Sequence, residues 1–172
     1  ARAMLLVDGA EAIAADLPRS ATTTIPIPAE AGDALGGGIR RRSALAAVRT
    51  RLTEAWPTSD DHVVAVGGDC SIAVPTADLA IADTPDVAVL WFDAHGDLHT
   101  AETSPSGAYA GMALRSLLGD GEFPAQRAAV RAEHTFIVGA RALDDAEAQF
   151  LATRPVQAVT VQEMEDPDRI AQ

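Results

Sequence analysis

Four short apolar runs, each about as long as one strand, constrain the fold of this 172-residue chain most strongly. The runs cover residues 62–66, 87–92, 134–138 and 156–161. They are continuously apolar rather than alternating, which is typical of strands in a parallel sheet that is covered on both faces. One segment with helical spacing precedes the first run, from Ser43 to before Pro57. Three more lie between the runs, at 71–82, 111–118 and 144–151. This alternation predicts an α/β fold with a doubly wound, parallel sheet.

The N-terminal third adds two further expected elements. Apolar residues at helical spacing predict a helix over residues 2–16, which ends before Pro18. The β-branched segment 22–27 predicts a short strand. Residues 29–38, which end in three glycines, predict a loop. The length fits a single domain.

Composition narrows the function classes. The chain has 25 acidic and 13 basic residues, and its net charge of −12 disfavours nucleic acids and anionic membranes as partners. Lysine is absent, which excludes Schiff-base chemistry on lysine and a phosphate loop of the Walker type. Cys70 is the single cysteine and cannot form an internal disulfide, so we expect a reducing, cytoplasmic location. The sequence shows no secretory signal and no membrane-spanning run. The arginine-only, alanine-rich composition indicates a bacterial, GC-rich genome.

Titratable side chains alternate with small or apolar residues directly after the run at 87–92. They are Asp93, His95, Asp97 and His99. In an extended chain every second side chain points to the same side, so these groups would converge. Their oxygen and nitrogen donors suit Mn²⁺, Fe²⁺, Co²⁺ or Zn²⁺, and a carboxylate such as that of Asp93 can bridge two ions. Ordinary loop polarity is the alternative, but burying four such groups without a metal would cost several kcal/mol.

Cys70 follows the run at 62–66 in the segment Gly67-Gly68-Asp69-Cys70-Ser71. A free cysteine most often behaves as a small buried apolar residue. Two functional roles remain open for Cys70: a soft metal ligand, or a nucleophile with His95 as its base.

Four segments, in order, resemble motifs of the ureohydrolase family, which includes arginases, agmatinases and formiminoglutamases. They are Gly67-Gly68-Asp69-Cys70-Ser71, then Trp91-Phe92-Asp93-Ala94-His95-Gly96-Asp97, then 104–112, and then Val138-Gly139-Ala140-Arg141 with Asp144 and Glu147. The resemblance covers residues 43–165 and implies a three-layer αβα sandwich with a mostly parallel sheet. It also implies that residues 1–172 are a single arginase-like α/β domain, the N-terminal part of a longer one.

The resemblance further implies a binuclear manganese centre with Cys70, Asp93, His95 and Asp97 as metal ligands. Asp93, which would bridge the ions, and His95 would be the catalytic residues. Four residues would bind the substrate: His99, Ser106, Asp144 and Glu147. The implied reaction is hydrolysis of a C–N bond in a small cationic guanidino compound, which releases urea or an analogue. Members of this family commonly assemble as trimers or hexamers.

The sequence departs from the family pattern in three places. Cys70 stands where the family has a histidine ligand, and its potential thiolate would shift the metal preference toward zinc or iron. Ala108 and Ala110 replace an asparagine and a proton-shuttling histidine, as in the branch that resembles hydroxyarginine amidinohydrolases. The family's Ser-x-Asp-x-Asp motif is absent, because the Asp166-Pro167-Asp168 segment has a different context. The 172 residues therefore supply about half of a binuclear site.

Three functional hypotheses follow. The first is a metal-dependent amidinohydrolase that acts on linear amidines. The second is a metal-independent hydrolase in which Cys70 is the nucleophile. The third is a non-catalytic protein that keeps the ureohydrolase fold.

Overall fold

A computed structural model describes residues 2–57, 62–82, 84, 86–127 and 129–164. Its α-helices are α1 (Arg2–Asp16), α2 (Arg42–Ala55), α3 (Ala73–Ala80), α4 (Ala113–Leu117), α5 (Asp145–Thr153) and α6 (Val161–Met164). Its strands are β1 (Val89–Phe92), β2 (Thr135–Ala140) and β3 (Gln157–Thr160). Short 3-10 helices cover Arg19–Ala21, Cys70–Ile72, Tyr109–Met112 and Ala132–His134.

The three strands form one parallel sheet in the order β1-β2-β3. Trp91 of β1 pairs with Ile137 of the central strand β2. The register between β2 and β3 shifts between Val138 and Ala140, where Gly139 has a φ of +88° that favours glycine. The parallel α/β class expected from the sequence is therefore confirmed.

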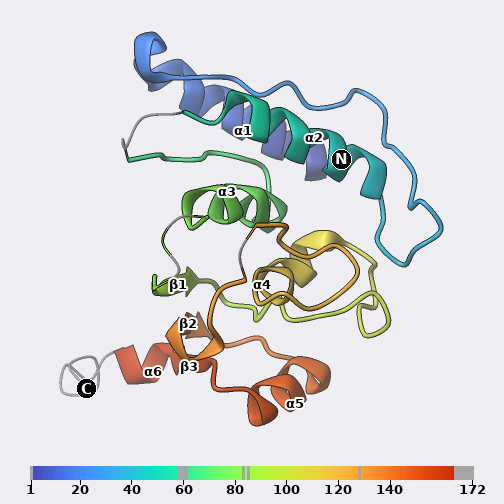
Figure 1. Cartoon of the computed structure of the whole chain (residues 1–172), viewed down its shortest axis with the longest axis vertical. Helices are drawn as coiled ribbons and strands as arrows, with labels where there is room; N and C mark the ends of the chain where they lie inside the picture. The colour runs from blue at the N-terminus through green and yellow to red at the C-terminus, as the bar shows by residue number, and fades with distance from the viewer. Residues whose placement is uncertain (1, 58–61, 83, 85, 128, 165–172) are drawn as a thin grey trace.

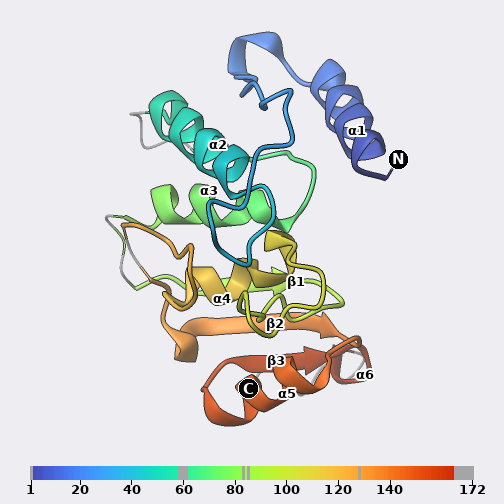
Figure 2. The ribbon, with the colours of Figure 1, turned by 90° about the vertical axis from the view of Figure 1, so that its right-hand side faces the viewer.

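The elements follow one another along the long axis of the molecule (Figures 1 and 2). Helices α1 and α2 lie at one end, α3 comes next, and α4 lies at the level of β1. Strands β2 and β3 follow, with α5 beyond them. The loops after β1 and β2 thus lie between the α3–α4 helices and α5.

The core lies where α3, α4 and the sheet meet. Val74 of α3, Leu114 and Leu117 of α4, and Ile137 of β2 are almost fully buried. Burying one such side chain stabilises the fold by roughly 1.5–3 kcal/mol, so this cluster anchors the helices on the strands.

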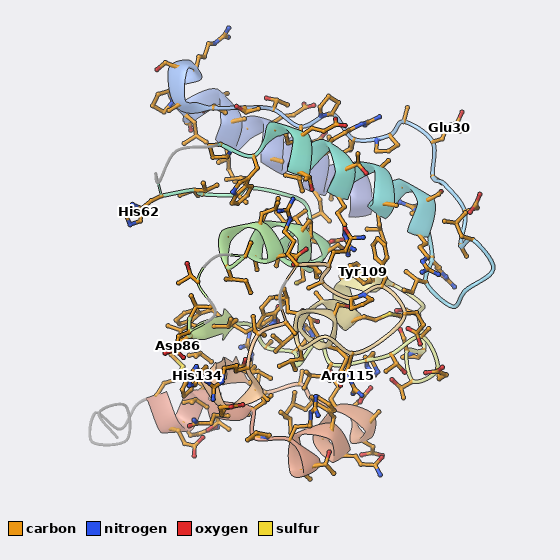
Figure 3. All side chains as sticks on the ribbon, viewed as in Figure 1. Glu30, His62, Asp86, Tyr109, Arg115 and His134 are labelled. Carbon is orange, nitrogen blue, oxygen red and sulfur yellow. The ribbon has the colours of Figure 1, made fainter. Side chains whose placement is uncertain are left out.

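An arginine–aromatic cluster ties α2 to the loop after α4. The guanidinium of Arg49, which is buried, lies 3.8 Å from the ring centroid of Phe123 and donates hydrogen bonds to the carbonyls of Phe123 and Pro124. The hydroxyl of Tyr109 donates to the Phe123 carbonyl at 2.7 Å. Tyr109 lies below α2 in Figure 3, where α2 approaches the loops around α4. This packing fixes the segment that precedes α4.

Two of the predicted strands are absent from the described structure. Residues 22–27 and 62–66 run without regular secondary structure. Residues 62–66 are exposed, and Val64 has 86% of its surface exposed. A strand forms only where its backbone pairs with another strand, and neither segment pairs with a described strand, although β1 has a free edge.

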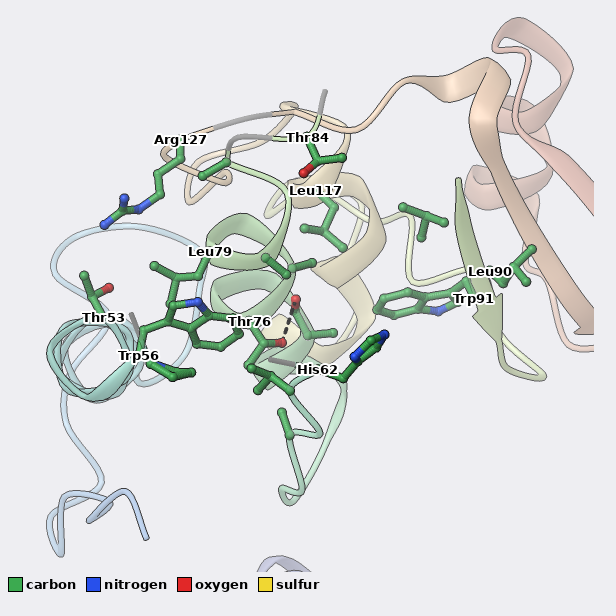
Figure 4. A pocket seen from close by; sticks show the side chains of 18 residues that line it. Thr53, Trp56, His62, Thr76, Leu79, Thr84, Leu90, Trp91, Leu117 and Arg127 are labelled. Atoms are coloured by element: carbon green, nitrogen blue, oxygen red, sulfur yellow. Dashed lines mark hydrogen bonds between the residues drawn. The ribbon is translucent and has the colours of Figure 1, made fainter. Parts of the chain in front are cut away.

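A cavity of about 950 Å³ separates residues 62–66 from β1 (Figure 4). It is lined by His62, Leu90 and Trp91, and on its other side by Trp56 and Leu79. The indole N–H of Trp91 is buried without a hydrogen-bond partner in the described structure. None of the predicted site residues lines this cavity.

The helices match the sequence prediction except at their ends. The helix predicted to begin at Ser43 begins one residue earlier, at Arg42 of α2, and the Ser43 hydroxyl accepts a hydrogen bond from the Asp33 N–H. The predicted strand at 156–161 is shorter, because Val161 begins α6. His134, predicted to begin a strand, ends a 3-10 helix. Residues 166–168 lie outside the described residues, among which no helix is long and apolar enough to cross a bilayer.

Candidate metal centre

The loop after β1 is held to β2 through its backbone. The Asp93 N–H donates to the Val138 carbonyl at 3.2 Å. The Ala94 carbonyl accepts from the N–H groups of Arg141 and Ala142, at 3.0 and 2.9 Å. These bonds place Asp93 at the carboxyl end of the sheet, where sites of parallel α/β folds lie.

The far end of the same loop is held by α4 and α5. The Asp97 carbonyl accepts from the Arg115 N–H at 3.1 Å, and the Leu98 N–H donates to Oε1 of Glu147 at 3.2 Å. A Cβ on Gly96 would lie 2.9 Å from that Glu147 oxygen, so the close approach requires glycine. The loop is thus fixed at both ends, which holds its side chains in place.

Cys70, Asp93 and Asp97 come together beside this loop. One ligand atom from each of the three lies within 4.8 Å of the other two. The Cys70 thiol donates to Oδ2 of Asp93, with a sulfur–oxygen distance of 3.5 Å. Cys70 begins a 3-10 helix that leads into α3, and the Asp69 carboxylate caps this turn by accepting from the Ser71 N–H. Cys70 therefore joins a cluster with Asp93, which lies 23 positions later in the sequence.

Among the residues of this cluster, Asp97 most clearly indicates a cation-binding site. Its surface is only 5% exposed, and its Oδ2 has no hydrogen-bond partner in the described structure. Its φ of +53° lies in the left-handed region, which side chains other than glycine seldom adopt. Burial raises the pKa of Asp97 to about 6, and the nearby charges of Asp93 and Glu147 add to the shift. A buried carboxylate with an unpartnered oxygen is costly unless a positive charge sits beside it, so this donor set fits a divalent ion.

The pKa values of the other two members of the cluster are shifted in opposite directions. Burial, followed by the negative charges of Asp97 and Asp93, raises the pKa of the Cys70 thiol to about 12. Burial would also raise the pKa of Asp93, but hydrogen bonds from the His95 backbone and ring and from Cys70 hold it below its usual value. Without a cation, the cluster therefore holds a charged Asp93 beside a protonated thiol.

His95 does not join the three-ligand group. Its Nδ1 lies 3.0 Å from Oδ1 of Asp93, and its side chain is 63% exposed. The expected extended alternation is wrong, because the chain bends at residues 94–95 and Asp97 is left-handed. Asp93 and Asp97 still converge, but they do so through a turn.

A second group of ligand-type side chains lies at the start of α5: His99, Asp144 and Glu147. Nε2 of His99 lies 3.0 Å from Oδ2 of Asp144, which is half-exposed. Nδ1 of His99 lies 3.1 Å from the Thr103 hydroxyl, a partner that the sequence did not reveal. Three of the four residues expected to bind substrate are thus brought together.

Glu147 is buried and fully engaged with the backbone. Besides the Leu98 N–H, it accepts from the Asp144 N–H at 3.3 Å, and its own N–H donates to Oδ1 of Asp144 at 3.0 Å. This capping box begins α5. The spacing Asp-x-x-Glu is the sequence signal for this role. Ser106 is exposed and accepts from the Ala108 N–H, and it belongs to neither group. Its proposed contact with substrate stays a prediction.

Comparison with known proteins agrees with the motifs. The family model "Arginase family" matches residues 20–171. The arginase of Bacillus caldovelox is 36% identical over 105 residues, which cover 58% of this chain and 35% of the relative. The N(omega)-hydroxy-L-arginine amidinohydrolase of Streptomyces lavendulae is 32% identical over 118 residues, which cover 69% of this chain and 42% of the relative. The chain thus spans well under half the length of these curated relatives.

The solved native structure of the Bacillus caldovelox arginase superimposes with a TM-score of 0.70 and 32% identity. The match covers 82% of this chain and 50% of that one. This similarity confirms the expected arginase-like αβα class, of which the three described strands and their helices form a part. Family model, relatives and fold agree: this chain belongs to the arginase family.

Proposed function

We propose that the protein is a metal-dependent amidinohydrolase that cleaves a C–N bond of a guanidino compound and releases urea or an analogue. The observation that carries this proposal is the convergence of Cys70, Asp93 and Asp97, with one buried Asp97 oxygen left without a partner. Membership of the arginase family supports the same class of hydrolase.

The residues of the cluster have different proposed roles in metal binding. Cys70, Asp93 and Asp97 would hold the first ion, and Asp93 would share a second. A divalent ion at this position supplies the activation of water at neutral pH, and the family resemblance implies manganese. His95 is a proposed ligand of the second ion, for which its ring must leave Oδ1 of Asp93.

The group at the start of α5 suits the outer end of a small cationic substrate. Asp144 is half-exposed and carries a carboxylate that can accept from an ammonium group, while its partner His99 is nearly buried. The chain's net charge of −12 attracts such a cation. We propose that His99 and Asp144, with Ser106 from the neighbouring loop, orient the substrate.

The leaving group distinguishes two substrate classes. Ala108 and Ala110 cannot transfer a proton, and losing general acid–base help costs about 10²–10⁴ in rate. A hydroxyguanidine offers a better leaving group than a guanidine and depends less on that help. The similarity to a hydroxyarginine amidinohydrolase supports this assignment, so we propose an N-hydroxyguanidino substrate.

Ala110→His should raise urea release from a plain guanidine by at least about tenfold, while changing the rate with the N-hydroxyguanidine much less. The backbone next to Ala110 lies beside His99, because the Gly111 carbonyl accepts a hydrogen bond from the His99 N–H at 3.0 Å. Ala110→Asn is the matched control, since it adds a polar side chain that does not shuttle protons. Equal gains with both variants would contradict this role.

The proposed function is tested by metal content and urea release. Protein purified without chelator should contain a divalent transition metal, EDTA should abolish urea release from guanidino compounds, and added metal should restore it. Activity that survives EDTA would instead support the Cys70 nucleophile, which the raised pKa of its thiol disfavours. Failure to bind metal and to release urea would support the non-catalytic hypothesis.

Two further proposals concern the oligomeric state and the cellular location of the protein. The family resemblance supports a homotrimer or homohexamer, and sedimentation equilibrium measures the state directly. The lone cysteine supports a reducing compartment such as the cytoplasm.

A further inference from the structure

We propose that Cys70 binds the first ion through its sulfur and makes this position select Zn²⁺ over Mn²⁺. The inference rests on the metal-dependent function proposed above and specifies the ion for one of its two positions. It sets this chain apart from the manganese expectation that the family resemblance carries.

The geometry places the Cys70 sulfur beside both carboxylates. Sγ of Cys70 lies 3.5 Å from Oδ2 of Asp93, and its distance to the ligand oxygen of Asp97 is at most 4.8 Å. An ion held between these two carboxylate oxygens would therefore lie within reach of Sγ. The capped 3-10 helix at Cys70–Ile72 and the start of α3 fix the position of the cysteine backbone.

A second observation points to a cation without reference to the cysteine. Oδ2 of Asp97 is buried and lacks a hydrogen-bond partner among the described residues. Only 5% of the surface of Asp97 is exposed, so solvent does not replace the missing partner. A bound cation is the partner that this oxygen lacks.

The donor set then decides the kind of cation. Mn²⁺ prefers carboxylate, carbonyl and water oxygens, whereas thiolate sulfur favours zinc. Zinc also binds more tightly than manganese to most mixed sites, and sulfur widens that difference. Two carboxylates and one thiolate would provide three protein ligands and leave a fourth position open, which is the arrangement of catalytic zinc sites. On binding, the Cys70 thiol gives its proton to solvent as the sulfur–metal bond forms.

The test uses Co²⁺ as a spectroscopic substitute for zinc. Addition of Co²⁺ to the full chain should produce a thiolate-to-cobalt charge-transfer band in the near ultraviolet. Because Cys70 is the only cysteine, this band can come from no other residue. Zn²⁺ should remove the band at stoichiometric amounts, whereas Mn²⁺ should require at least about a hundredfold excess.

Two variants report on the role of the sulfur. Cys70→Ser should bind Co²⁺ without the charge-transfer band. Cys70→His should reduce the preference for Zn²⁺ over Mn²⁺ by at least about tenfold, since imidazole is less selective than thiolate. Far-ultraviolet circular dichroism establishes that each variant is folded, and the wild-type spectrum alone tests sulfur ligation if a variant is not.

The outcomes separate this inference from the proposed function. Co²⁺ or Mn²⁺ binding without a sulfur band, or tighter binding of Mn²⁺ than of Zn²⁺, would overturn the inference while leaving a metal-dependent hydrolase intact. Binding of no divalent ion at all would contradict the proposed function itself and this inference with it.

Discussion

Replacing Asp97 with asparagine should stabilise the metal-free protein at pH 8 and, in the same variant, remove stabilisation by a divalent ion. The carboxylate is buried with one unpartnered oxygen, and its pKa is raised from 3.8 to about 6. At pH values above 6 this shift corresponds to roughly 3 kcal/mol of lost stability. Asparagine keeps the shape, removes the charge and tolerates the φ of +53° at this position.

The sign of the effect follows from proton linkage. The folded state binds a proton at Asp97 more tightly than the unfolded state does. The stability that this proton adds to the folded state is therefore fully present below pH 4. It is lost progressively as pH rises through about 6. The gain from Asp97→Asn should therefore be close to zero near pH 4 and reach about 3 kcal/mol by pH 8. Urea unfolding of both proteins in EDTA across this pH range measures the difference.

Asp93→Asn provides the matched control. Asp93 accepts hydrogen bonds from His95 and Cys70, and these hold its pKa below the usual value. Its replacement should not stabilise the metal-free protein, although it should also weaken metal binding. Added Zn²⁺ should raise the melting temperature of the wild type but of neither variant. A metal-free Asp97→Asn variant that is less stable than the wild type at pH 8 would contradict our assignment of an unpaired, buried charge.

The sequence correctly predicted three strands, and each of them pairs with another strand of the described chain. The runs at 87–92, 134–138 and 156–161 became β1, β2 and β3 because each can pair with the next. The run at 62–66 has the same apolar character, but a cavity separates it from β1, which has a free edge. Apolarity measures the tendency to be buried in a sheet, and it carries no information on which edge is available.

The candidate site was located by residue type but not by conformation. Asp93, Asp97 and Cys70 were expected together and are found together. The extended geometry that predicted the convergence of Asp93 and Asp97 would also have brought in His95, which instead bonds to Asp93. A positive φ at a non-glycine residue, as at Asp97, has no clear signature in the sequence. It depends on the contacts that hold the loop, among them the one from Glu147.

Glu147→Ala should destabilise the fold by about 3 kcal/mol. The carboxylate, on a residue that is 4% exposed, accepts from the N–H groups of Leu98 and Asp144. Its loss leaves the buried Leu98 N–H without a partner, at a cost of about 1–3 kcal/mol, and removes half of the capping box, at about 1 kcal/mol. The charge of Glu147 also raises the pKa of Asp97, so its removal returns a smaller part of this cost. Urea unfolding at pH 7 in EDTA gives the free energy.

The same substitution should weaken metal binding by about 10–100-fold, because Glu147 holds the backbone of the residue that follows Asp97. Asp145→Ala in the same turn is the control for the change in charge, since Asp145 is exposed and should change stability by less than about 0.5 kcal/mol. Glu147→Gln retains one oxygen for the Leu98 N–H and should fall between the two. If Glu147→Ala unfolds like the Asp145 control yet still loses metal, Glu147 acts on the ion directly. If it loses stability and metal affinity together, the buried carboxylate acts by holding the loop that carries Asp97.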